Sequence, residues 1–294
     1  MARPMSRRRR LRLLRTVVGL VVLVVAIVRL VTAGSGNASA RQTTPPTDHA
    51  SAPPSARGVT DPFTDPAVRE YLTGRANVTA AIYDQRSGRT WTFNPRAEDV
   101  TASIEKVDIL ATLLADHRSE PMSRAEAETV TEMIEVSDND AAQDLWDRVG
   151  GAEGVGDFNH AIGMSHTALN TLGYWGLSRT SAADQVTLLR QIAYPGRLTV
   201  KSRQTAWSLM THVTPSQAWG VTAGLPPGAT VAVKNGWLPR ASGWQVNCDG
   251  IVRGAGYDDV VCIMTRDDAT EADGIATISR LAGLLWRALR PTSA

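Results

Sequence analysis

Residues 102–107 read Ala-Ser-Ile-Glu-Lys-Val, and they open a segment in which apolar residues recur at helical spacing as far as Leu114. This spacing predicts a helix that begins at Ser103. Ser103 and Lys106 are three residues apart, so they lie on one face of that helix, one turn apart. An amine held partly out of water beside a hydroxyl can accept its proton, and a helix N-terminus stabilises a developing oxyanion. The alternative is a helix-capping serine followed by a surface lysine.

A second motif, Ser-Asp-Asn at residues 137–139, lies between two segments with helical spacing. At such a place the hydroxyl of Ser137 can relay a proton to a leaving group, and the amide of Asn139 can hold a substrate carbonyl. The alternative is a simple cap for the helix that starts at Ala141.

A third motif, Lys-Asn-Gly at residues 234–236, follows an alternating run from Thr230, and we expect the strand to end at this motif. A cation at Lys234 can bind a substrate carboxylate, and the absence of a side chain at Gly236 lets the strand approach a ligand closely. The alternative is an ordinary strand end with turn residues.

Each motif alone is better explained by its simpler alternative, but their order along the chain is that of the catalytic motifs of β-lactamases and penicillin-binding proteins. Over roughly residues 61–289, the chain resembles the superfamily of class A β-lactamases and penicillin-binding transpeptidases. The resemblance implies that Ser103 is the acylated nucleophile, that Lys106 is its general base or proton relay, and that Ser137 is a second proton shuttle. The substrate-binding residues that it implies are Asn139, Lys234, Asn235, Gly236 and Trp237, with the backbone N–H groups of Ser103 and Trp237 as the oxyanion hole.

The chain departs from this family pattern in two places. Asn235 stands where the family has a hydroxyl residue, although its amide could donate to a substrate carboxylate instead. The loop expected between Leu169 and Thr180 contains no acid, whereas active class A enzymes use a loop glutamate to hydrolyse the acyl-serine. One alignment places His166 at the glutamate position, but a shorter loop fits the flanking residues better. The resemblance therefore implies slow deacylation.

Three other residues with titratable side chains are expected to have structural roles. Glu105 points off the helix face that carries the serine and lysine, and we expect it on the surface or paired with an arginine. Cys248 and Cys262 lie on two strand-like runs that would face each other across a hairpin. Either a disulfide or a pair of small buried side chains fits that placement. Two cysteines without nearby histidines cannot complete a metal site, and the sequence predicts neither a metal nor a cofactor.

The remaining pattern predicts the fold class. A helix start at residues 65–66 precedes a strand-like pair over residues 78–93. Residues 104–192 have mainly helical spacing, strand signals return over residues 230–265, and a final helix is expected over residues 269–289. The sequence therefore predicts an α+β fold of the β-lactamase and transpeptidase type, with an antiparallel sheet formed from both chain ends and an inserted all-helical lobe.

The N-terminal part of the chain has the composition of a targeting segment. Residues 1–40 contain eight arginines and no acid, together with an apolar run over residues 17–28. This pattern predicts a cleaved export signal or a retained N-terminal membrane anchor, and either one sends the body out of the cytoplasm. We therefore expect an extracytoplasmic protein, secreted or membrane-anchored. Residues 41–60 are rich in Pro, Ser, Thr and Ala and predict a flexible linker, and residues 61–294 are assigned to the serine hydrolase domain.

The charge of the body narrows the possible partners. Beyond residue 40 the chain has 23 basic and 29 acidic residues, a net charge of about −6. This balance argues against nucleic acid as a partner, because such binding needs a basic face. We expect a monomer that acts on a β-lactam or a small peptidoglycan-derived substrate and contacts the membrane if the N-terminal segment is uncleaved. Three functions remain open: a class A β-lactamase-like hydrolase, a D-alanyl-D-alanine peptidase or transpeptidase, and a cell-wall or β-lactam binding or sensor module without turnover.

Overall fold

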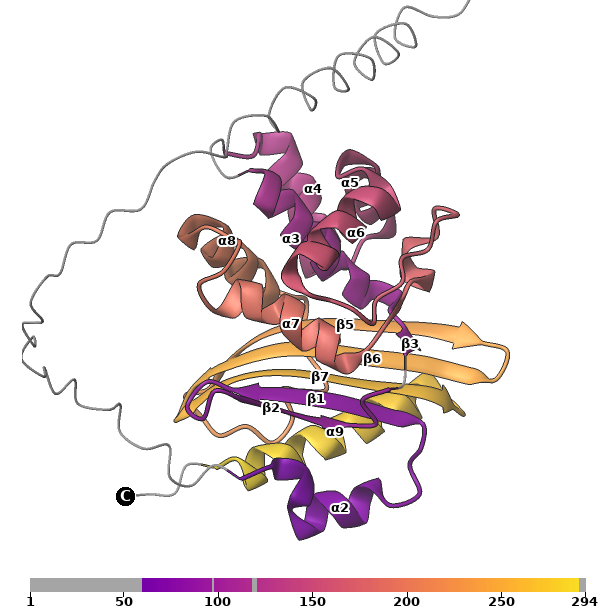
Figure 1. Ribbon diagram of the computed structural model, residues 1–294, viewed down its shortest axis with the longest axis vertical. Helices are drawn as coiled ribbons and strands as arrows, with labels where there is room; N and C mark the ends of the chain where they lie inside the picture. Colours follow the sequence, from indigo (N-terminus) through magenta and orange to yellow (C-terminus); the bar gives the residue numbers. More distant parts are fainter. Residues whose placement is uncertain (1–59, 97, 118–120, 291–294) are drawn as a thin grey trace, which may run out of the picture. The chain divides into compact units, whose positions relative to one another are not determined.

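The computed structural model describes residues 60–96, 98–117 and 121–290. Its centre is an antiparallel sheet of five strands in the order β2-β1-β7-β6-β5 (Figure 1). Two strands precede the helical segment in the chain and three follow it, so both ends of the domain build one sheet. The strands are β1 (Val78–Asp84), β2 (Arg89–Phe93), β5 (Thr230–Arg240), β6 (Gly243–Gly254) and β7 (Tyr257–Asp268).

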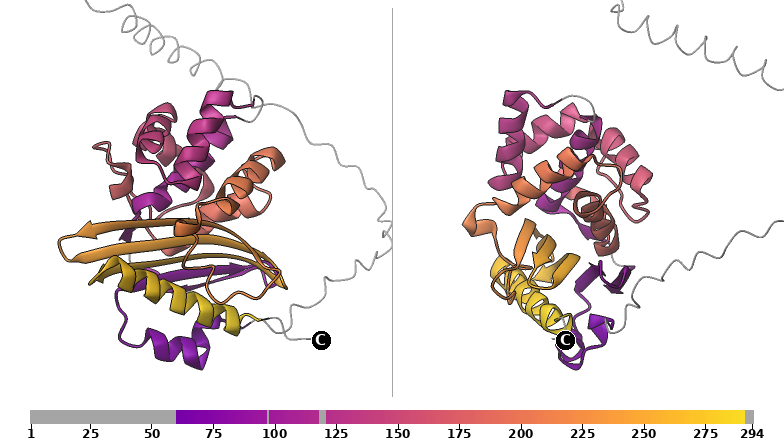
Figure 2. Two further views of the ribbon diagram at one scale, coloured as in Figure 1. Left: turned by 180° about the vertical axis from the view of Figure 1, so that it is seen from behind. Right: turned by 90° about the vertical axis from the view of Figure 1, so that its left-hand side faces the viewer.

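Helices cover both faces of the sheet (Figures 1 and 2). On one face, α2 (Pro66–Leu72) and α9 (Glu271–Ala288) enclose one cluster of buried apolar side chains. The helical lobe encloses a second cluster on the other face. Its helices are α3 (Glu105–Asp116), α4 (Arg124–Glu135), α5 (Asn139–Arg148), α6 (Gly151–Ile162), α7 (Ala182–Ala193) and α8 (Val200–Thr211). This arrangement confirms the predicted α+β class with an inserted helical lobe.

Short elements join the lobe to the sheet. A separate two-stranded sheet forms where β3 (Asp99–Val100) pairs with β4 (Arg179–Thr180). Two-residue strands carry no periodicity, so the sequence did not predict them. The pairing matters because β3 leads directly to Ser103 and β4 closes the loop that follows Leu169. The 3-10 helices are η1 (Pro62–Thr64), η2 (Ala102–Ile104), η3 (Trp175–Leu177) and η4 (Pro215–Gln217).

The first helix begins where the sequence predicts. The Asp65 carboxylate accepts hydrogen bonds from the backbone N–H groups of Ala67 (2.9 Å) and Val68 (3.3 Å), and Pro66 takes the first helical position. Such a cap satisfies N–H groups that have no partner inside the helix, and proline at this position loses no hydrogen bond.

The predicted export segment, residues 1–40, and nearly all of the predicted linker, residues 41–60, lie outside the described residues. Among the residues that are described, no helix combines the length and the apolar character that crossing a membrane requires.

The two cysteines occupy neighbouring strands but opposite faces of the sheet. Cys248 on β6 pairs with Ile263, and Cys262 on β7 pairs with Asp249, so the two differ in register by one residue. A one-residue offset reverses the face to which a strand side chain points. Each thiol is free and buried in a different core cluster. The disulfide is therefore wrong, and the alternative of two small buried side chains is confirmed.

Two buried carboxyl groups lie side by side on neighbouring strands of the sheet. Asp84 on β1 lies opposite Asp259 on β7, and both are fully buried. Arg86 binds the Asp84 carboxylate at 3.0 and 2.9 Å, whereas no described residue forms an ion pair with Asp259. Burial, followed by the charge of Asp84, raises the pKa of Asp259 to about 7.

We expect Asp259→Asn to stabilise the fold above pH 7. Since the folded-state pKa lies above the unfolded value, the fold favours the protonated carboxyl, and stability is lost as pH rises through about 7. The amide imitates the neutral carboxyl, so the free energy of unfolding should rise by about 1–3 kcal/mol at pH 8 and by less at pH 5. Urea unfolding at both pH values measures the change, with the exposed Asp157→Asn as the control. An equal gain at both pH values would contradict this account.

Candidate active site

Ser103 lies in the 3-10 turn η2, immediately before α3 rather than inside it. Ala102, the residue before it, has a positive φ of 47°, an uncommon conformation for a residue with a side chain. The turn is fixed to the sheet by Asn247 on β6, whose side-chain amide donates to the carbonyl oxygens of Val100 and Thr101 at 2.8 Å each. The backbone strain and these bonds together set the direction of the Ser103 side chain.

Lys106 is fully buried, one helical turn after Ser103. Its Nζ donates to the carbonyl oxygen of Ser137 (2.6 Å), to Ser137 Oγ (3.0 Å) and to Asn139 Oδ1 (2.8 Å). Burial lowers the pKa of Lys106 to about 8, a shift that the charge of Asp138 only partly opposes. The second predicted motif therefore lies against the first, and the lysine amine is neutral more often than an exposed one.

Lys234 on β5 reaches the same hydroxyl from the sheet side. Its Nζ donates to Ser137 Oγ at 2.9 Å and to the carbonyl oxygen of Asn235 at 3.0 Å. Burial, followed by the charge of Lys106, lowers the pKa of Lys234 to about 7. Ser137 has a φ of 60°, so its backbone is also in the left-handed region. The structure thus brings Lys106, Ser137 and Lys234 together from three distant chain segments, with Ser137 Oγ between the two amines.

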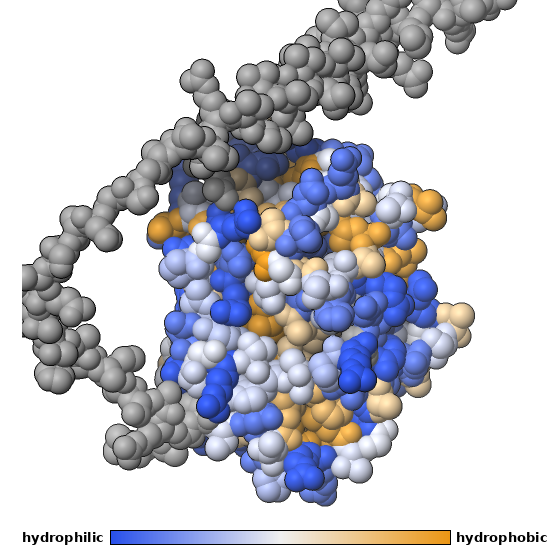
Figure 3. Space-filling model, in the orientation of Figure 1, coloured by the Kyte–Doolittle hydropathy of each residue, from blue (hydrophilic) through white to orange (hydrophobic). Residues whose placement is uncertain are grey.

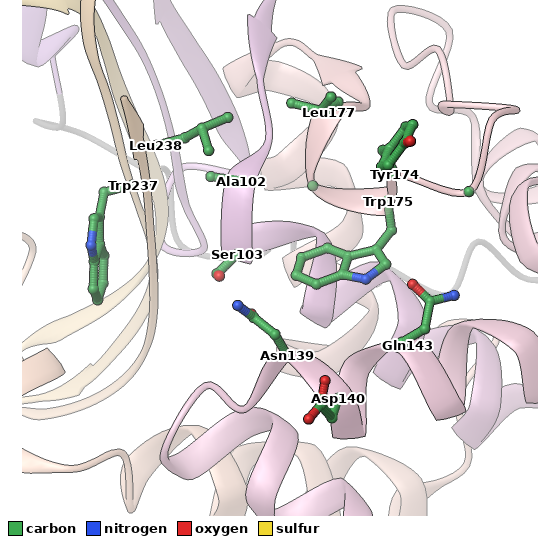
Figure 4. Close-up of a pocket in the computed structure, with 12 residues that line it drawn as sticks. Ala102, Ser103, Asn139, Asp140, Gln143, Tyr174, Trp175, Leu177, Trp237 and Leu238 are labelled. Atoms are coloured by element: carbon green, nitrogen blue, oxygen red, sulfur yellow. The ribbon is translucent and has the colours of Figure 1, made fainter. Parts of the chain in front are cut away.

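The Ser103 hydroxyl opens into a cleft of about 420 Å³ and makes no hydrogen bond with any described residue. Figure 4 shows Trp237 and Trp175 on opposite sides of Ser103, with the nitrogen end of Asn139 directed toward the serine. The walls of the cleft are mostly aromatic and aliphatic. They comprise Gly173, Tyr174, Trp175, Gly176 and Leu177 of the loop, Trp237 and Leu238 of β5, and Asn139, Asp140 and Gln143 of α5.

Gly236 allows β5 to pass close to Ser103. A Cβ atom at this position would lie 2.6 Å from the backbone N of Ser103 and 2.9 Å from that of Ile104. No side chain fits at such distances, so the glycine is required by the close approach of strand and turn. The prediction that the strand ends at this motif is wrong, because β5 continues to Arg240. The continuation extends one wall of the cleft beyond Ser103.

The side chain of Asn235 points into the protein. Its Nδ2 donates to the carbonyl oxygens of Gln217 and Trp219, the latter at 3.3 Å, so both amide hydrogens are used internally. The side chain is almost fully buried. A role as a substrate ligand stays a prediction, and this geometry does not favour it.

The loop after Leu169 places an indole ring beside Lys106. A backbone bridge between Ala168 and Arg179 closes the loop, and Asn170 Oδ1 accepts hydrogen bonds from two N–H groups within it. The ring of Trp175 lies 5.0 Å from Lys106 Nζ, in cation–π contact. His166 does not line the cleft and faces Glu98 at 4.0 Å, so it finds no support as a general base.

Glu105 is fully buried, and the expectation of a surface residue is wrong. Every residue of α3 from Glu105 to Leu114 is buried, so the face turned away from the serine is not a solvent face. Burial, followed by the charge of Asp108, raises the pKa of Glu105 well above its usual range, and the Thr101 and Ser178 side chains offset only part of that rise. The carboxyl therefore favours its protonated form.

Sequence reasoning missed two residues that shape the site. Asn247 holds the Ser103 turn against the sheet, and a lone asparagine inside a strand pattern gives no signal for such a role. Trp175 covers Lys106, and the only signal was its place in the acid-free loop. The described residues contain no cluster of His, Cys, Asp and Glu side chains able to hold a metal ion.

A family model described as the Beta-lactamase enzyme family matches residues 126–289, more than half of the chain. The match begins after Lys106, so the roles of Ser103 and Lys106 rest on their motif and on the geometry above. No curated protein matches the sequence significantly.

Several solved structures are similar to the domain. The class A beta-lactamase from Mycobacterium abscessus has a TM-score of 0.65 and 19% sequence identity, covering 75% of this chain and 96% of that protein. The chromosome-encoded beta-lactamase of Vibrio parahaemolyticus has a TM-score of 0.66 and 16% identity, covering 77% and 98%. A class A beta-lactamase from Bacteroides cellulosilyticus has a TM-score of 0.66 and 17% identity, covering 76% and 96%. At this level of identity, the likeness establishes the fold alone.

Proposed function

Because the chain belongs to the beta-lactamase enzyme family, we propose that it is a serine acyl-transfer enzyme whose Ser103 attacks the carbonyl carbon of a β-lactam or a D-alanyl-type peptide. The observation that carries the proposal is the hydrogen-bonded group of Lys106, Ser137 and Lys234 next to the cleft that contains Ser103. Two buried amines with lowered pKa values beside one hydroxyl are unfavourable for folding and useful for proton transfer. An acyl-enzyme at Ser103 is therefore the expected intermediate.

The acylation step moves one proton from the Ser103 hydroxyl to the leaving nitrogen. A neutral Lys106 amine accepts this proton while the Ser103 oxygen forms its bond to the carbonyl carbon. The resulting ammonium transfers a proton to Ser137 Oγ, 3.0 Å away, while Ser137 passes its own proton to the nitrogen and the carbon–nitrogen bond breaks, so that Lys106 and Ser137 return to their starting protonation states. The carbonyl oxygen is stabilised by the backbone N–H groups of Ser103 and Trp237, which Gly236 allows to lie on one side of the cleft.

Release of the acyl group should be slow. The loop from Leu169 to Thr180 carries no carboxylate that could activate a water, and Trp175 places an apolar ring over Lys106 instead. Loss of a general base slows a step by about a hundredfold or more. The same observation favours a second candidate function, a β-lactam or cell-wall binding module that is acylated without turnover.

Intact-mass measurement of the purified protein with a penicillin tests the proposal. We expect a mass increase equal to the whole penicillin, a long-lived adduct and little hydrolysed product. Ser103→Ala should abolish the adduct, whereas the control Ser165→Ala, on the exposed surface, should leave it unchanged. Rapid product formation would overturn slow deacylation, and the absence of any adduct would overturn the assignment of Ser103.

We also propose that the reaction takes place outside the cytoplasm. The support is the sequence of residues 1–40, with its eight arginines followed by an apolar run. Fractionation of cells that express the full chain tests this. Recovery of the protein only in the cytoplasm would overturn it.

A further inference from the structure

A second cavity, of about 490 Å³, is lined in part by residues that lie two positions along the chain from residues of the catalytic cleft. In three separate chain segments, one residue lines the cleft and a residue two positions away lines the second cavity. Ala102 lines the cleft and Val100 the second cavity, and the same step relates Leu177 to Arg179 and Leu238 to Arg240. Of these pairs, Leu238 and Arg240 lie on the same strand, β5, and residues two apart on an extended strand point to the same face. The second cavity therefore lies further along β5 than the cleft.

The second cavity is rich in arginine. Arg96, Arg179, Arg240 and Arg266 line it, together with the acids Glu98, Asp99 and Asp267. This concentration of guanidinium groups lies on a body whose acidic residues outnumber its basic ones. Figure 3 shows hydrophilic residues gathered on the side where β3 and the tip of β5 and β6 lie. We call this cavity the arginine pocket.

Two of the four arginines are held in place by the protein. Arg266 donates to Asp99 Oδ1 at 3.1 Å and to the carbonyl oxygen of Ala76 at 2.6 Å. Arg179 donates to the carbonyl oxygen of Glu98 at 2.6 Å. The guanidinium groups of the other two, Arg96 and Arg240, form no hydrogen bond or ion pair with any described residue. The pocket therefore has two guanidinium groups with all their hydrogen-bond donors available.

The position of the arginine pocket decides which part of a substrate reaches it. Lys234 and Ser137, which serve the leaving group, lie before Gly236 on the path along β5, and Arg240 lies after it. The acyl part of a substrate bound at Ser103 therefore extends toward Arg240. Four strand residues from Gly236 to Arg240 span about 13 Å. The Arg240 side chain covers part of this distance, so an acyl chain of about six carbon atoms is long enough to reach its guanidinium group.

The edge of the sheet supports such a course. β5 is the last strand in the sheet order, so its outer edge pairs with no other strand among the residues that the structure describes. Its free N–H and C=O groups can pair with an extended amide in the acyl donor. The donor would then be directed along the strand from Ser103 toward the arginine pocket.

We propose that the arginine pocket binds a carboxylate at the end of the acyl donor that is distant from the bond cleaved at Ser103. This inference rests on the proposed function. Arg96 and Arg240 supply the charge-assisted hydrogen bonds, whereas Arg179 and Arg266 are paired with Glu98 and Asp99 in the wall of the pocket. The acyl donor that fits the whole site has an amide next to the reacting carbonyl, an apolar middle that passes Leu177 and Leu238, and a terminal acid.

The test uses two penicillins that differ only at that end: 6-aminopenicillanic acid acylated with adipic acid, and the same nucleus acylated with hexanoic acid. Both keep the β-lactam and its own carboxylate. We expect the adipoyl compound to acylate Ser103 about tenfold faster, in line with one charge-assisted hydrogen bond at a partly exposed site. The preference should shrink in high salt, because screening weakens exposed pairs.

The variants locate the effect. Arg240→Gln and Arg96→Gln should each lower the preference, and the double variant should remove it while the hexanoyl rate stays unchanged. The control is Arg124→Gln on α4, which makes the same change in net charge at a side chain that is 92% exposed. An equal loss in this control would show a general charge effect and overturn the assignment.

A binding measurement separates failure of this inference from failure of the proposed function. Ser103→Ala cannot form the acyl-enzyme, so its affinity for each compound is measured at equilibrium. A preference for the adipoyl compound in this variant, with no adduct in the wild type, would keep the arginine pocket and overturn the proposed function. Acylation of the wild type at equal rates by both compounds, or no binding preference in Ser103→Ala, would overturn the arginine pocket.

Discussion

Gly236→Ala should lower the rate of Ser103 acylation by about a hundredfold or more while the protein stays folded. The new Cβ would lie 2.6 Å from the backbone N of Ser103, so the strand and the serine turn must move apart. The backbone N–H groups of Ser103 and Trp237 then no longer converge on one oxygen. The rate of adduct formation by intact mass measures the loss, and thermal unfolding reports whether the fold persists.

The matched control is Gly156→Ala on α6, where a Cβ meets no atom within 4 Å. Alanine is the better helix former by about 1 kcal/mol, so this variant should be as stable as the wild type or more stable, with an unchanged acylation rate. A fast Gly236→Ala enzyme would show that β5 does not shape the oxyanion site. If Gly236→Ala unfolds, the glycine is required for stability. The acylation rate of Trp237→Ala, which loses the indole and keeps the backbone N–H group, would then be compared with that of the wild type, and an unchanged rate would agree with a role of the N–H group alone.

Acylation should depend on pH in a bell-shaped manner, with its maximum between about pH 7 and pH 8. Burial lowers the pKa of Lys106 to about 8 and that of Lys234 to about 7, and the two amines interact through Ser137. They therefore titrate as a pair, which holds one proton inside this window. Below it both amines are charged and no base is present, and above it no cation remains for the substrate carboxylate.

The expected decline is about tenfold for each pH unit below the window, measured as the second-order rate of adduct formation. Lys234→Met should remove the alkaline limb and move the acid limb to higher pH, because Lys106 no longer has a charged neighbour. Unfolding measured over the same pH range shows whether the limbs reflect loss of structure. A rate that stays constant from pH 5 to pH 9 would rule out either lysine as the base.

The position of the proposed catalytic residues is the reason that we expect acylation at Ser103 and slow release of the acyl group. Acylation needs the amines and Ser137, which are anchored to α3, α5 and β5. Deacylation would need a base on the other side of the cleft, where Trp175 lies against Lys106. An apolar ring excludes water from the acyl-serine ester and supplies no base that could activate a water molecule. The same site could instead transfer the acyl group from Ser103 to an amine acceptor.

Local patterns predicted the elements well. The cap at Asp65, the hairpin around residues 84–89 and the serine motif before α3 depend on side chains within one turn of each other. The family resemblance that the three motifs carry also implied which segments meet at the site. The expectations that failed are the exposure of Glu105, the end of β5 and the disulfide between the two cysteines, and each of them depends on how distant segments pack.

The amino-acid sequence by itself determined most of the longer helices and strands, because propensity, capping and periodicity act between near neighbours. Its motifs also indicated the residues that can exchange protons. The tertiary structure alone decided that Cys248 and Cys262 face opposite ways, that Trp175 covers Lys106, and that four arginines surround one pocket. These features depend on strand register and on the packing of distant segments. A shift of one residue in register reverses every side chain of a strand, and no local pattern records which register the packed core will select.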